Sequence, residues 1–192
     1  EDDGSFTPLL AESLPEYSED GKTVTVKLRS GVTFHDGTPF NADAVINTFN
    51  CIKDPDFGST RASLASSIES MEAPDENTVV FHLSYPDGVF LAKLSHVNSA
   101  IVSPTAQQNQ DLMVQPCGTG PYKFVSAVSG SNVVLTRNDE YWGQKAQIKD
   151  VTYTVITEES TALSRLETGE ADLMPSITVE NLSRVEAMPN VC

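Results

Sequence analysis

Two adjacent residues, His35 and Asp36, are of the types that serve as a general base and its orienting acid. Neighbouring side chains in a turn rarely point at one target, and no Ser or Cys in the chain stands in a nucleophile-elbow motif. His82 falls on the polar face of a predicted strand, and His96 follows a predicted short helix. The sequence therefore predicts no catalytic residue. A hydrolase with paired carboxylates such as Asp36 and Asp43 is the minor alternative, because no sequence feature fixes the separation of those two groups.

Three cysteines, Cys51, Cys117 and Cys192, lie far apart in the sequence. No CxxC pair and no Cys/His spacing typical of zinc sites occurs, so neither a metal nor a cofactor is predicted. Cys51 falls on an apolar-rich predicted helix and Cys117 stands before a glycine turn, which favours small buried hydrophobic side chains. A Cys51–Cys117 disulfide stays open, because the sequence does not supply its geometry.

Two short motifs suggest nucleotide chemistry, and neither has the context that it needs. Asp56-Phe57-Gly58 spells the metal-binding triplet of protein kinases, but no glycine-rich loop or HRD segment accompanies it. Gly118-Thr119-Gly120 lacks the third glycine of a dinucleotide fingerprint and precedes Pro121 and a predicted strand rather than a helix. We interpret this glycine pair as a tight turn, and we expect Gly120 to have a positive φ that a side chain would penalise.

The chain is strongly acidic: 12 Lys and Arg stand against 27 Asp and Glu, a formal net charge of −15. Phosphate binding requires clustered cations, so the charge argues against nucleic acid and against an anionic membrane surface as partners. An acidic, solvated surface is the favoured interpretation, and attraction of a cationic ligand is the alternative. No apolar run approaches the roughly 18 residues that a membrane-crossing helix needs.

The elements that must position these residues begin in residues 18–45. From Val24 to Leu28 apolar and polar residues alternate, the period-2 pattern of a half-buried strand. Turns follow at Gly31 and at Asp36-Gly37. Asn41 then caps a helix in which apolar residues recur at i, i+3, i+4 and i+7.

Two hairpins and a strand–helix–strand unit are predicted farther along the chain. They are the hairpins Ile68–Ala73 with Asn77–Leu83 and Tyr122–Val128 with Asn132–Arg137, the strand Ile148–Ile156, a helix capped by Thr157 and ended by Gly169, and the strand Ala171–Met174. This pattern predicts a mixed α+β (α/β) fold, in which antiparallel hairpins with helices are followed by the start of a central βαβ sheet. We divide it into a hairpin-rich part, residues 1–147, and the start of a central-sheet part, residues 148–192.

The sequence of residues 18–45, SEDGKTVTVKLRSGVTFHDGTPFNADAV, closely resembles the opening signature of the extracellular solute-binding proteins of family 5. These proteins serve peptide, dipeptide and nickel ABC importers. Four further anchors of that family occur in the right order. They are Pro8-Leu9-Leu10-Ala11-Glu12, Gly118-Thr119-Gly120-Pro121-Tyr122, Asn138 with Tyr141-Trp142-Gly143, and Gly169-Glu170-Ala171-Asp172-Leu173.

This resemblance implies the first lobe of a type II periplasmic-binding-protein-like fold, with the second lobe absent from these residues. It implies capture of an oligopeptide or dipeptide between two lobes and presentation of the closed form to an ABC permease, without catalysis. The location would be periplasmic or extracellular, with a lipoprotein anchor in the full-length protein. The alternative is the ligand-sensing module of a regulator with the same fold.

The resemblance also points to candidate ligand-binding residues. In similar proteins the segment before the Ile68 strand and a short extended piece near Ala100 approach the cleft between the lobes. Arg61 is the one cation in the first segment, and Asn98 and Ser99 are polar groups in the second. Arg61 could hold a ligand carboxylate bidentately, or it could be a solvated surface arginine. Nickel-binding members of the family are expected to have Trp and Arg where this chain has Arg61 and Ala100. This difference argues against a metal chelate as the ligand.

Overall fold

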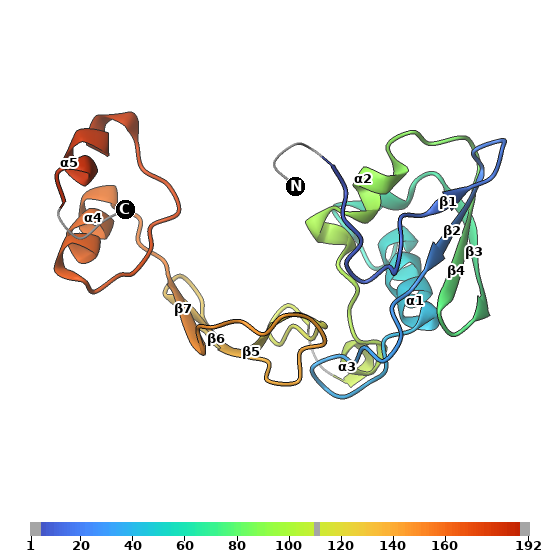
Figure 1. Ribbon diagram of the computed structural model, residues 1–192, viewed down its shortest axis with the longest axis horizontal. Coiled ribbons are helices and arrows are strands. Elements are labelled where there is room, and N and C mark those ends of the chain that lie inside the picture. Colours follow the sequence, from blue (N-terminus) through green and yellow to red (C-terminus); the bar gives the residue numbers. More distant parts are fainter. Residues whose placement is uncertain (1–4, 110–111, 189–192) are drawn as a thin grey trace. The chain divides into compact units, whose positions relative to one another are not determined.

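The computed structural model describes residues 5–109 and 112–188, so Cys192 lies outside the described residues. The chain divides into two compact units. Unit 1 holds the residues up to Val125 together with Leu135–Asp150, and unit 2 holds Ser126–Val134 and the residues from Val151 onward (Figure 1). The predicted division between residues 147 and 148 stays a prediction.

A four-stranded antiparallel sheet forms the frame of unit 1. Its strands are β1 (Glu16–Tyr17), β2 (Thr23–Lys27), β3 (Ile68–Asp75) and β4 (Thr78–Leu83), in the order β1-β2-β4-β3. The register pairs Val24 with Phe81 and Val26 with Val79. Since all four of these side chains are buried, the apolar face of the predicted strand lies against the core, as expected.

Glycines with a left-handed backbone shape the turns around β2. Gly21, Gly31 and Gly37 have φ values of 67°, 73° and 83°. A residue with a side chain is penalised in this region, so these three positions require glycine. The turns predicted at Gly31 and Asp36-Gly37 are therefore confirmed.

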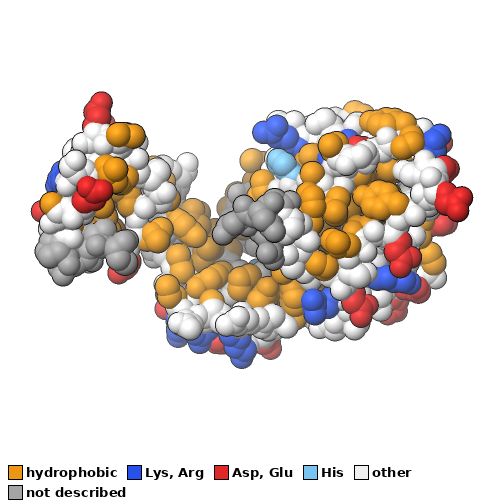
Figure 2. Space-filling view, turned by 45° about the horizontal axis from the view of Figure 1, so that its top comes forward, with side chains coloured by type: hydrophobic (Ala, Val, Ile, Leu, Met, Phe, Trp, Pro, Cys, Tyr) orange, Lys and Arg blue, Asp and Glu red, His pale blue; other side chains and the backbone are white. Residues whose placement is uncertain are grey.

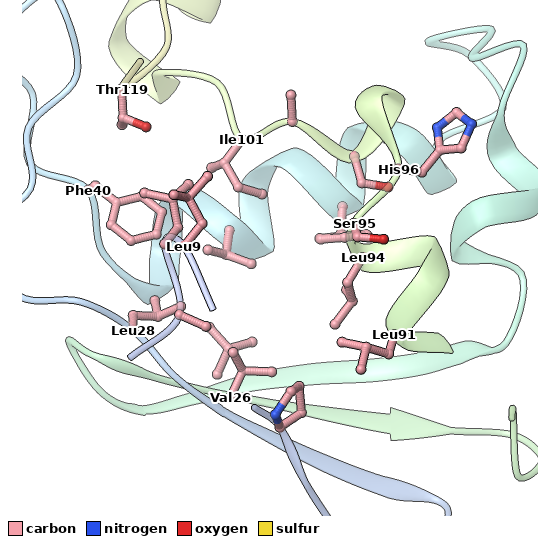
Figure 3. A pocket seen from close by; sticks show the side chains of 18 of the residues that line it. Leu9, Val26, Leu28, Phe40, Leu91, Leu94, Ser95, His96, Ile101 and Thr119 are labelled. Atoms are coloured by element: carbon pink, nitrogen blue, oxygen red, sulfur yellow. The ribbon is translucent and has the colours of Figure 1, made fainter. Parts of the chain in front are cut away.

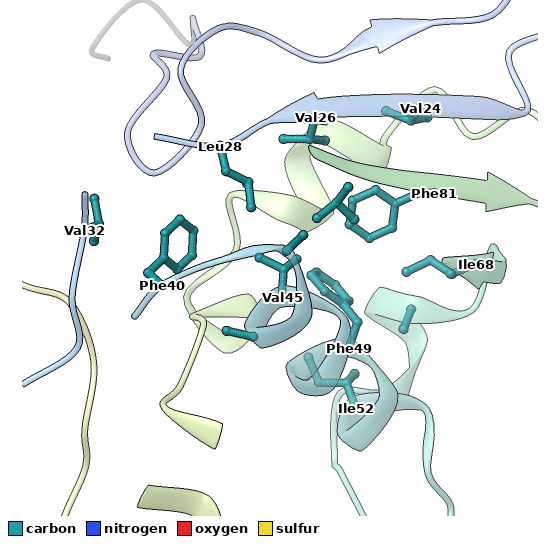
Figure 4. Close-up of a cluster of buried hydrophobic side chains, with 14 of the residues drawn as sticks. Val24, Val26, Leu28, Val32, Phe40, Val45, Phe49, Ile52, Ile68 and Phe81 are labelled. Carbon is teal, nitrogen blue, oxygen red and sulfur yellow. The ribbon is translucent and has the colours of Figure 1, made fainter. Parts of the chain in front are cut away.

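Helix α1 (Ala42–Lys53) packs against β3 and β4. Asn41 Oδ1 accepts a hydrogen bond from the Ala44 N–H at 3.0 Å, which confirms the predicted cap. Phe49 of α1 meets Phe81 edge-on with ring centroids 5.5 Å apart, and Phe81 meets Phe90 in the same way at 5.3 Å. All three rings belong to the buried hydrophobic cluster, and Figure 4 shows Phe49 and Phe81 between the helix and the sheet.

Short helices follow in unit 1: η1 (Ala62–Ala65), α2 (Phe90–Leu94), η2 (Val97–Ser99) and α3 (Pro104–Asn109). A partly buried ion pair ties α2 to the loop before it, because Lys93 Nζ lies 2.6 Å from Asp87 Oδ2. Ser67 Oγ donates to the same carboxylate oxygen at 2.6 Å. The pKa of Asp87 is lowered: burial alone would raise it, but the hydrogen bonds from Lys93 and Ser67 outweigh that effect.

A second sheet contains β5 (Tyr122–Val128), β6 (Asn132–Arg137) and β7 (Asp150–Thr154), in the order β5-β6-β7. The strands of the second hairpin have the predicted bounds, and the predicted strand Ile148–Ile156 is shorter than expected. Trp142 of unit 1 packs against the buried cluster and donates from Nε1 to the Thr119 carbonyl at 3.1 Å.

Unit 2 contains α4 (Glu159–Thr168), η3 (Val179–Asn181) and α5 (Leu182–Glu186). Gly169 ends α4 with a φ of 75°, as predicted, but the predicted cap Thr157 is wrong: Glu158 holds the cap position, without a side-chain hydrogen bond. The predicted strand Ala171–Met174 is also wrong, since these residues form no strand and Leu173 is exposed. A strand needs a hydrogen-bonding neighbour, and the described residues give this segment none.

Two further expectations concern residues 117–120 and the cysteines. Gly120 does not have a positive φ, and an added Cβ would meet no atom within 4 Å, so the predicted backbone strain is wrong. Cys51 and Cys117 are both free thiols in the structure, which closes the disulfide question for the described residues. No helix of the described residues is long and apolar enough to cross a membrane.

Candidate functional site

A cavity of about 730 Å³ in unit 1 brings together two of the three predicted ligand-binding residues, Arg61 and Asn98. Its volume falls in the range of about 300–1,000 Å³ that small-molecule sites occupy. Four parts of the chain line this Arg61 cavity: α1, residues 57–61, residues 98–102 and the region of α3. The lining residues are Thr48, Cys51, Ile52, Phe57, Gly58, Ser59, Thr60, Arg61, Asn98, Ala100, Val102, Gln107, Leu112 and Met113.

The break after α1 positions Arg61. The helix ends at Asp54, and Gly58 turns the chain with a φ of 67°. Arg61 then occupies the cap position of η1, where its backbone N–H donates to Ser59 Oγ at 3.3 Å. Its side chain is exposed and forms no ion pair with any residue that the structure describes. The guanidinium is therefore able to hold an external carboxylate with two parallel hydrogen bonds.

Asn98 and Ser99 belong to η2, and the structure separates them. Asn98 is exposed and lines the Arg61 cavity, and its backbone N–H donates to His96 Nδ1 at 3.0 Å. Ser99 does not line this cavity. It is buried, and its Oγ donates to the Lys93 carbonyl at 2.7 Å, so this hydroxyl already has a partner within the chain.

Two polar side chains that the sequence did not single out complete the cavity. Gln107 accepts at Oε1 from Asn47 Nδ2 at 2.7 Å, and its Nε2 lies 2.7 Å from Cys51 Sγ. Thr48 is buried, donates to the Ala44 carbonyl and accepts from the Val102 N–H. No sequence pattern connects these residues, because their contacts join positions more than fifty residues apart.

The charge of the Arg61 cavity is opposite to that of the whole chain. Arg61 is the only charged residue among the described residues that line it, and none of them is an acid. The acidic residues that give the chain its net charge of −15 therefore lie outside this lining. Such a lining suits a ligand with a carboxylate, and it does not support attraction of a cationic ligand to this cavity.

A second cavity, of about 600 Å³, is lined in part by residues 95–97 and 99–101 (Figure 3). Ala100 borders both cavities, and Ser99 lines this one. The walls of this apolar cavity come from the N-terminal segment from Phe6 to Pro15, from β2, β4 and α1, and from α2 with the residues after it.

The residues around His35 and Asp36 hold three segments together. His35 Nε2 lies 2.9 Å from the Gly120 carbonyl oxygen, and Asp36 Oδ2 accepts from Ser103 Oγ at 2.5 Å. Burial would raise the pKa of Asp36, but the hydrogen bonds from Ser103 and Thr38 outweigh this, and its pKa is lowered.

The nearby Cys117 thiol is buried, and burial raises its pKa. A buried thiol of raised pKa is a poor nucleophile. Neither Asp36 nor Asp43, the pair of the hydrolase alternative, lines either cavity. No group of three or more His, Cys, Asp or Glu that could hold a metal ion occurs among the residues that the structure describes.

Residues 5–191 match the family described as bacterial extracellular solute-binding proteins, family 5 Middle. The chain belongs to this family, and the resemblance found in the sequence is confirmed. The glutathione-binding protein GsiB of Pectobacterium atrosepticum is 34% identical to this chain over 181 residues, which cover 93% of the chain and 35% of GsiB. The chain spans about a third of the length of the curated relatives that it matches.

Solved structures confirm the fold. The periplasmic binding protein DppA of Helicobacter pylori, in complex with the peptide STSA, matches 95% of this chain and 40% of its own, with a TM-score of 0.84 and 32% identity. AgaA of A. tumefaciens R10, in complex with agropinic acid, matches 97% of this chain and 38% of its own, with a TM-score of 0.89 and 30% identity. The mixed arrangement of helices and antiparallel strands is therefore that of a periplasmic-binding-protein lobe.

Proposed function

We propose that this protein captures a small solute, an oligopeptide or dipeptide, for an ABC-type importer and performs no chemistry on it. The observation that carries the proposal is the family match over residues 5–191 combined with an arginine, in a cavity of ligand size, that forms no ion pair with any described residue. Two of the similar structures are complexes, DppA with the peptide STSA and AgaA with agropinic acid. Solutes of both kinds carry carboxylates.

Arg61 is the proposed anchor for the carboxylate of the solute. Asn98 and Thr60 lie in the same lining and offer amide and hydroxyl groups to the polar backbone of a peptide. Ile52, Phe57 and Leu112 supply the apolar surface that an uncharged side chain of the solute would contact. Ser99 contributes by fixing η2 through its hydrogen bond to the Lys93 carbonyl.

This chain supplies one wall of the proposed site. A binding protein of two lobes closes on its solute because the closed state gains contacts that the open state lacks. The other wall would come from the part of the protein that has no counterpart in these 192 residues. The proposed partner is therefore an ABC permease that recognises the closed form, and the proposed location is the periplasm or the cell exterior, with a lipid anchor in the full-length protein.

Isothermal titration calorimetry of the full-length protein with di- to pentapeptides and glutathione tests the proposal. We expect at least one of these solutes to bind with a Kd of 10 µM or tighter, a free energy of about −7 kcal/mol or more favourable. Chromatography of the solute after overnight incubation should recover it unchanged. Reproducible turnover that Asp36→Asn abolishes would overturn the non-catalytic assignment in favour of the hydrolase alternative.

A further inference from the structure

The Arg61 cavity contains a chemically reactive group that the proposed function does not use, the thiol of Cys51. Cys51 belongs to α1, is free and half-buried, and lines the cavity. Cys117 provides the contrast, because it is only 5% exposed and burial raises the pKa of its thiol. Of these two cysteines, Cys51 is therefore the one that a molecule entering a cavity of ligand size can reach.

Contacts between α1 and α3 fix the sulfur of Cys51. Gln107 Nε2 lies 2.7 Å from Cys51 Sγ, and Gln107 Oε1 accepts a hydrogen bond from Asn47 Nδ2 at 2.7 Å. The contact with Asn47 sets the orientation of the Gln107 amide, so that its N–H groups rather than its oxygen face the sulfur. The thiol is therefore held in one position at the surface of the cavity.

The guanidinium of Arg61 gives this cavity an independent preference for an anion. It is the only charged group among the described residues of the lining, and it has no ion-pair partner in that part of the chain. Acidic side chains are spread over the surface of unit 1 among hydrophobic and basic ones (Figure 2). The surface as a whole therefore repels an anion that Arg61 attracts. Partly exposed cysteines in electropositive surroundings are the reactive ones, and Cys51 has both properties.

We propose that Cys51 is a site of reversible S-thiolation by a small disulfide that carries a carboxylate, and that this modification closes the Arg61 cavity to its solute. The carboxylate binds Arg61, and the thiol of Cys51 loses its proton to water. The resulting thiolate attacks one sulfur of the disulfide, a Cys51–sulfur bond forms, and the S–S bond of the reagent breaks. The other half leaves as a thiolate and takes up a proton. Cys51 is oxidised and the leaving half is reduced, so no further oxidant is needed.

The effect on solute binding rests on the proposed function. The half that stays on Cys51 occupies part of a cavity of about 730 Å³, and its carboxylate holds the Arg61 guanidinium. A peptide then loses both space and the anchor for its own carboxylate. The proposed location supplies the reagent class, because disulfides persist outside the reducing cytosol. A reducing thiol reverses the exchange and reopens the cavity.

Disulfides of similar size and different charge test the site in the full-length protein. Dithiodipropionate carries carboxylates, hydroxyethyl disulfide is neutral and cystamine carries ammonium groups. Mass spectrometry of the digested protein measures the rate at which the peptide that contains Cys51 is modified. We expect dithiodipropionate to react at least tenfold faster than cystamine, with the neutral reagent between them. Arg61→Ala should bring this ratio below threefold, whereas Arg61→Lys should keep it. Arg29→Ala, outside both cavities, is the control and should also keep it.

A wild-type ratio below threefold would overturn the proposal, and so would a ratio that Arg61→Ala leaves unchanged, because the cavity would then not select the reagent by its charge. Failure of all three reagents to modify Cys51 would overturn it as well.

Calorimetry tests whether the modification closes the cavity. We expect protein thiolated with dithiodipropionate to bind the tightest-binding peptide at least tenfold more weakly than untreated protein, and dithiothreitol to restore the binding. Equal binding by thiolated and untreated protein would overturn the closure of the cavity. If the untreated protein binds no peptide, the proposed function fails, whereas the rates with the three disulfides still decide whether Cys51 is a thiolation site.

Discussion

The two cavities of unit 1 have similar volumes, about 730 and 600 Å³, and opposite chemistry. The Arg61 cavity offers a guanidinium that has no ion-pair partner among the described residues, and the side-chain amide of the exposed Asn98. In the apolar cavity, the Ser95 and Ser99 hydroxyls and His96 Nδ1 bond to the neighbouring backbone, and most of the other lining side chains are hydrophobic. Volume alone therefore does not identify a ligand site, whereas the availability of its polar groups does.

The two cavities share a short stretch of chain, residues 95–101, as part of their lining, and contacts with α2 hold this stretch in place. The Asp87–Lys93 ion pair holds α2, and Ser99 bonds back to the Lys93 carbonyl. Asn98 thereby lies on the Arg61 side and Ser99 on the apolar side. Two adjacent polar residues thus serve different purposes, one available for recognition and one for the stability of the wall.

The largest contrast should come from removing one phenyl ring from each cavity. Phe81→Ala deletes a ring that is 1% exposed and contacts Phe49 and Phe90, so we expect a loss of about 3–5 kcal/mol of unfolding free energy. Phe57→Ala deletes a ring that is 61% exposed in the Arg61 cavity, and we expect about 0.5 kcal/mol or less. Urea denaturation of the full-length protein measures both, and equal losses would contradict the difference in burial between the Phe81 and Phe57 rings.

The contribution of the Asp87–Lys93 ion pair to the stability of the shared wall can be tested by removing the charge of Asp87. Asp87→Asn leaves the Lys93 ammonium without its buried counter-charge, and we expect a loss of about 1–3 kcal/mol at pH 7. Because the folded-state pKa of Asp87 is lowered, its stabilising contribution is complete above the unfolded value of about 3.9 and is lost as the pH falls through the folded-state pKa.

The difference in unfolding free energy between the wild type and Asp87→Asn should therefore shrink as the pH is lowered below about 3.9. Guanidinium titrations of both proteins at pH 7 and at pH 2–3 measure this difference. A difference that stays constant over this interval would mean that the ion pair does not hold the wall.

The smallest contrast compares two glycines. Gly37 has a φ of 83°, so Gly37→Ala should cost about 1–2 kcal/mol. Gly120 lines the apolar cavity with an ordinary φ and open space around its Cα, so Gly120→Ala should change the stability by less than about 0.5 kcal/mol. Thermal denaturation distinguishes the two, and a loss at Gly120 as large as that at Gly37 would contradict the open space and the ordinary φ of Gly120.

Local patterns predicted the local structure well. The alternation from Val24 to Leu28, the cap at Asn41 and the turn glycines depend on neighbours in the sequence, and all are confirmed. The helix cap predicted at Thr157 is a local prediction that failed, whereas two other failed predictions depend on distant partners. A strand at Ala171–Met174 needs a neighbour that the described residues do not contain, and the backbone of Gly120 is set by contacts with His35 and Asn138.

The candidate site was predictable only in part. Arg61 and Asn98 could be selected because the family resemblance pointed to their segments and because they are polar residues in short, irregular stretches. Nothing in the sequence pairs Gln107 with Cys51 or Thr48 with Val102, since these contacts form only when α1 and the residues from Val102 to α3 pack together. Ser99 shows the converse: its residue type suggested a ligand contact, and burial gives its hydroxyl a partner in the chain.

The central claim is that Arg61 binds the carboxylate of the solute, and a double-mutant cycle by calorimetry tests it most directly. The full-length wild type and Arg61→Ala are each titrated with the tightest-binding peptide and with its C-terminal amide, and Arg29→Ala, outside both cavities, is the control. We expect Arg61→Ala to weaken binding of the free acid at least tenfold, about 1.4 kcal/mol, and binding of the amide less than threefold. Equal losses for acid and amide, or none for either, would contradict the account.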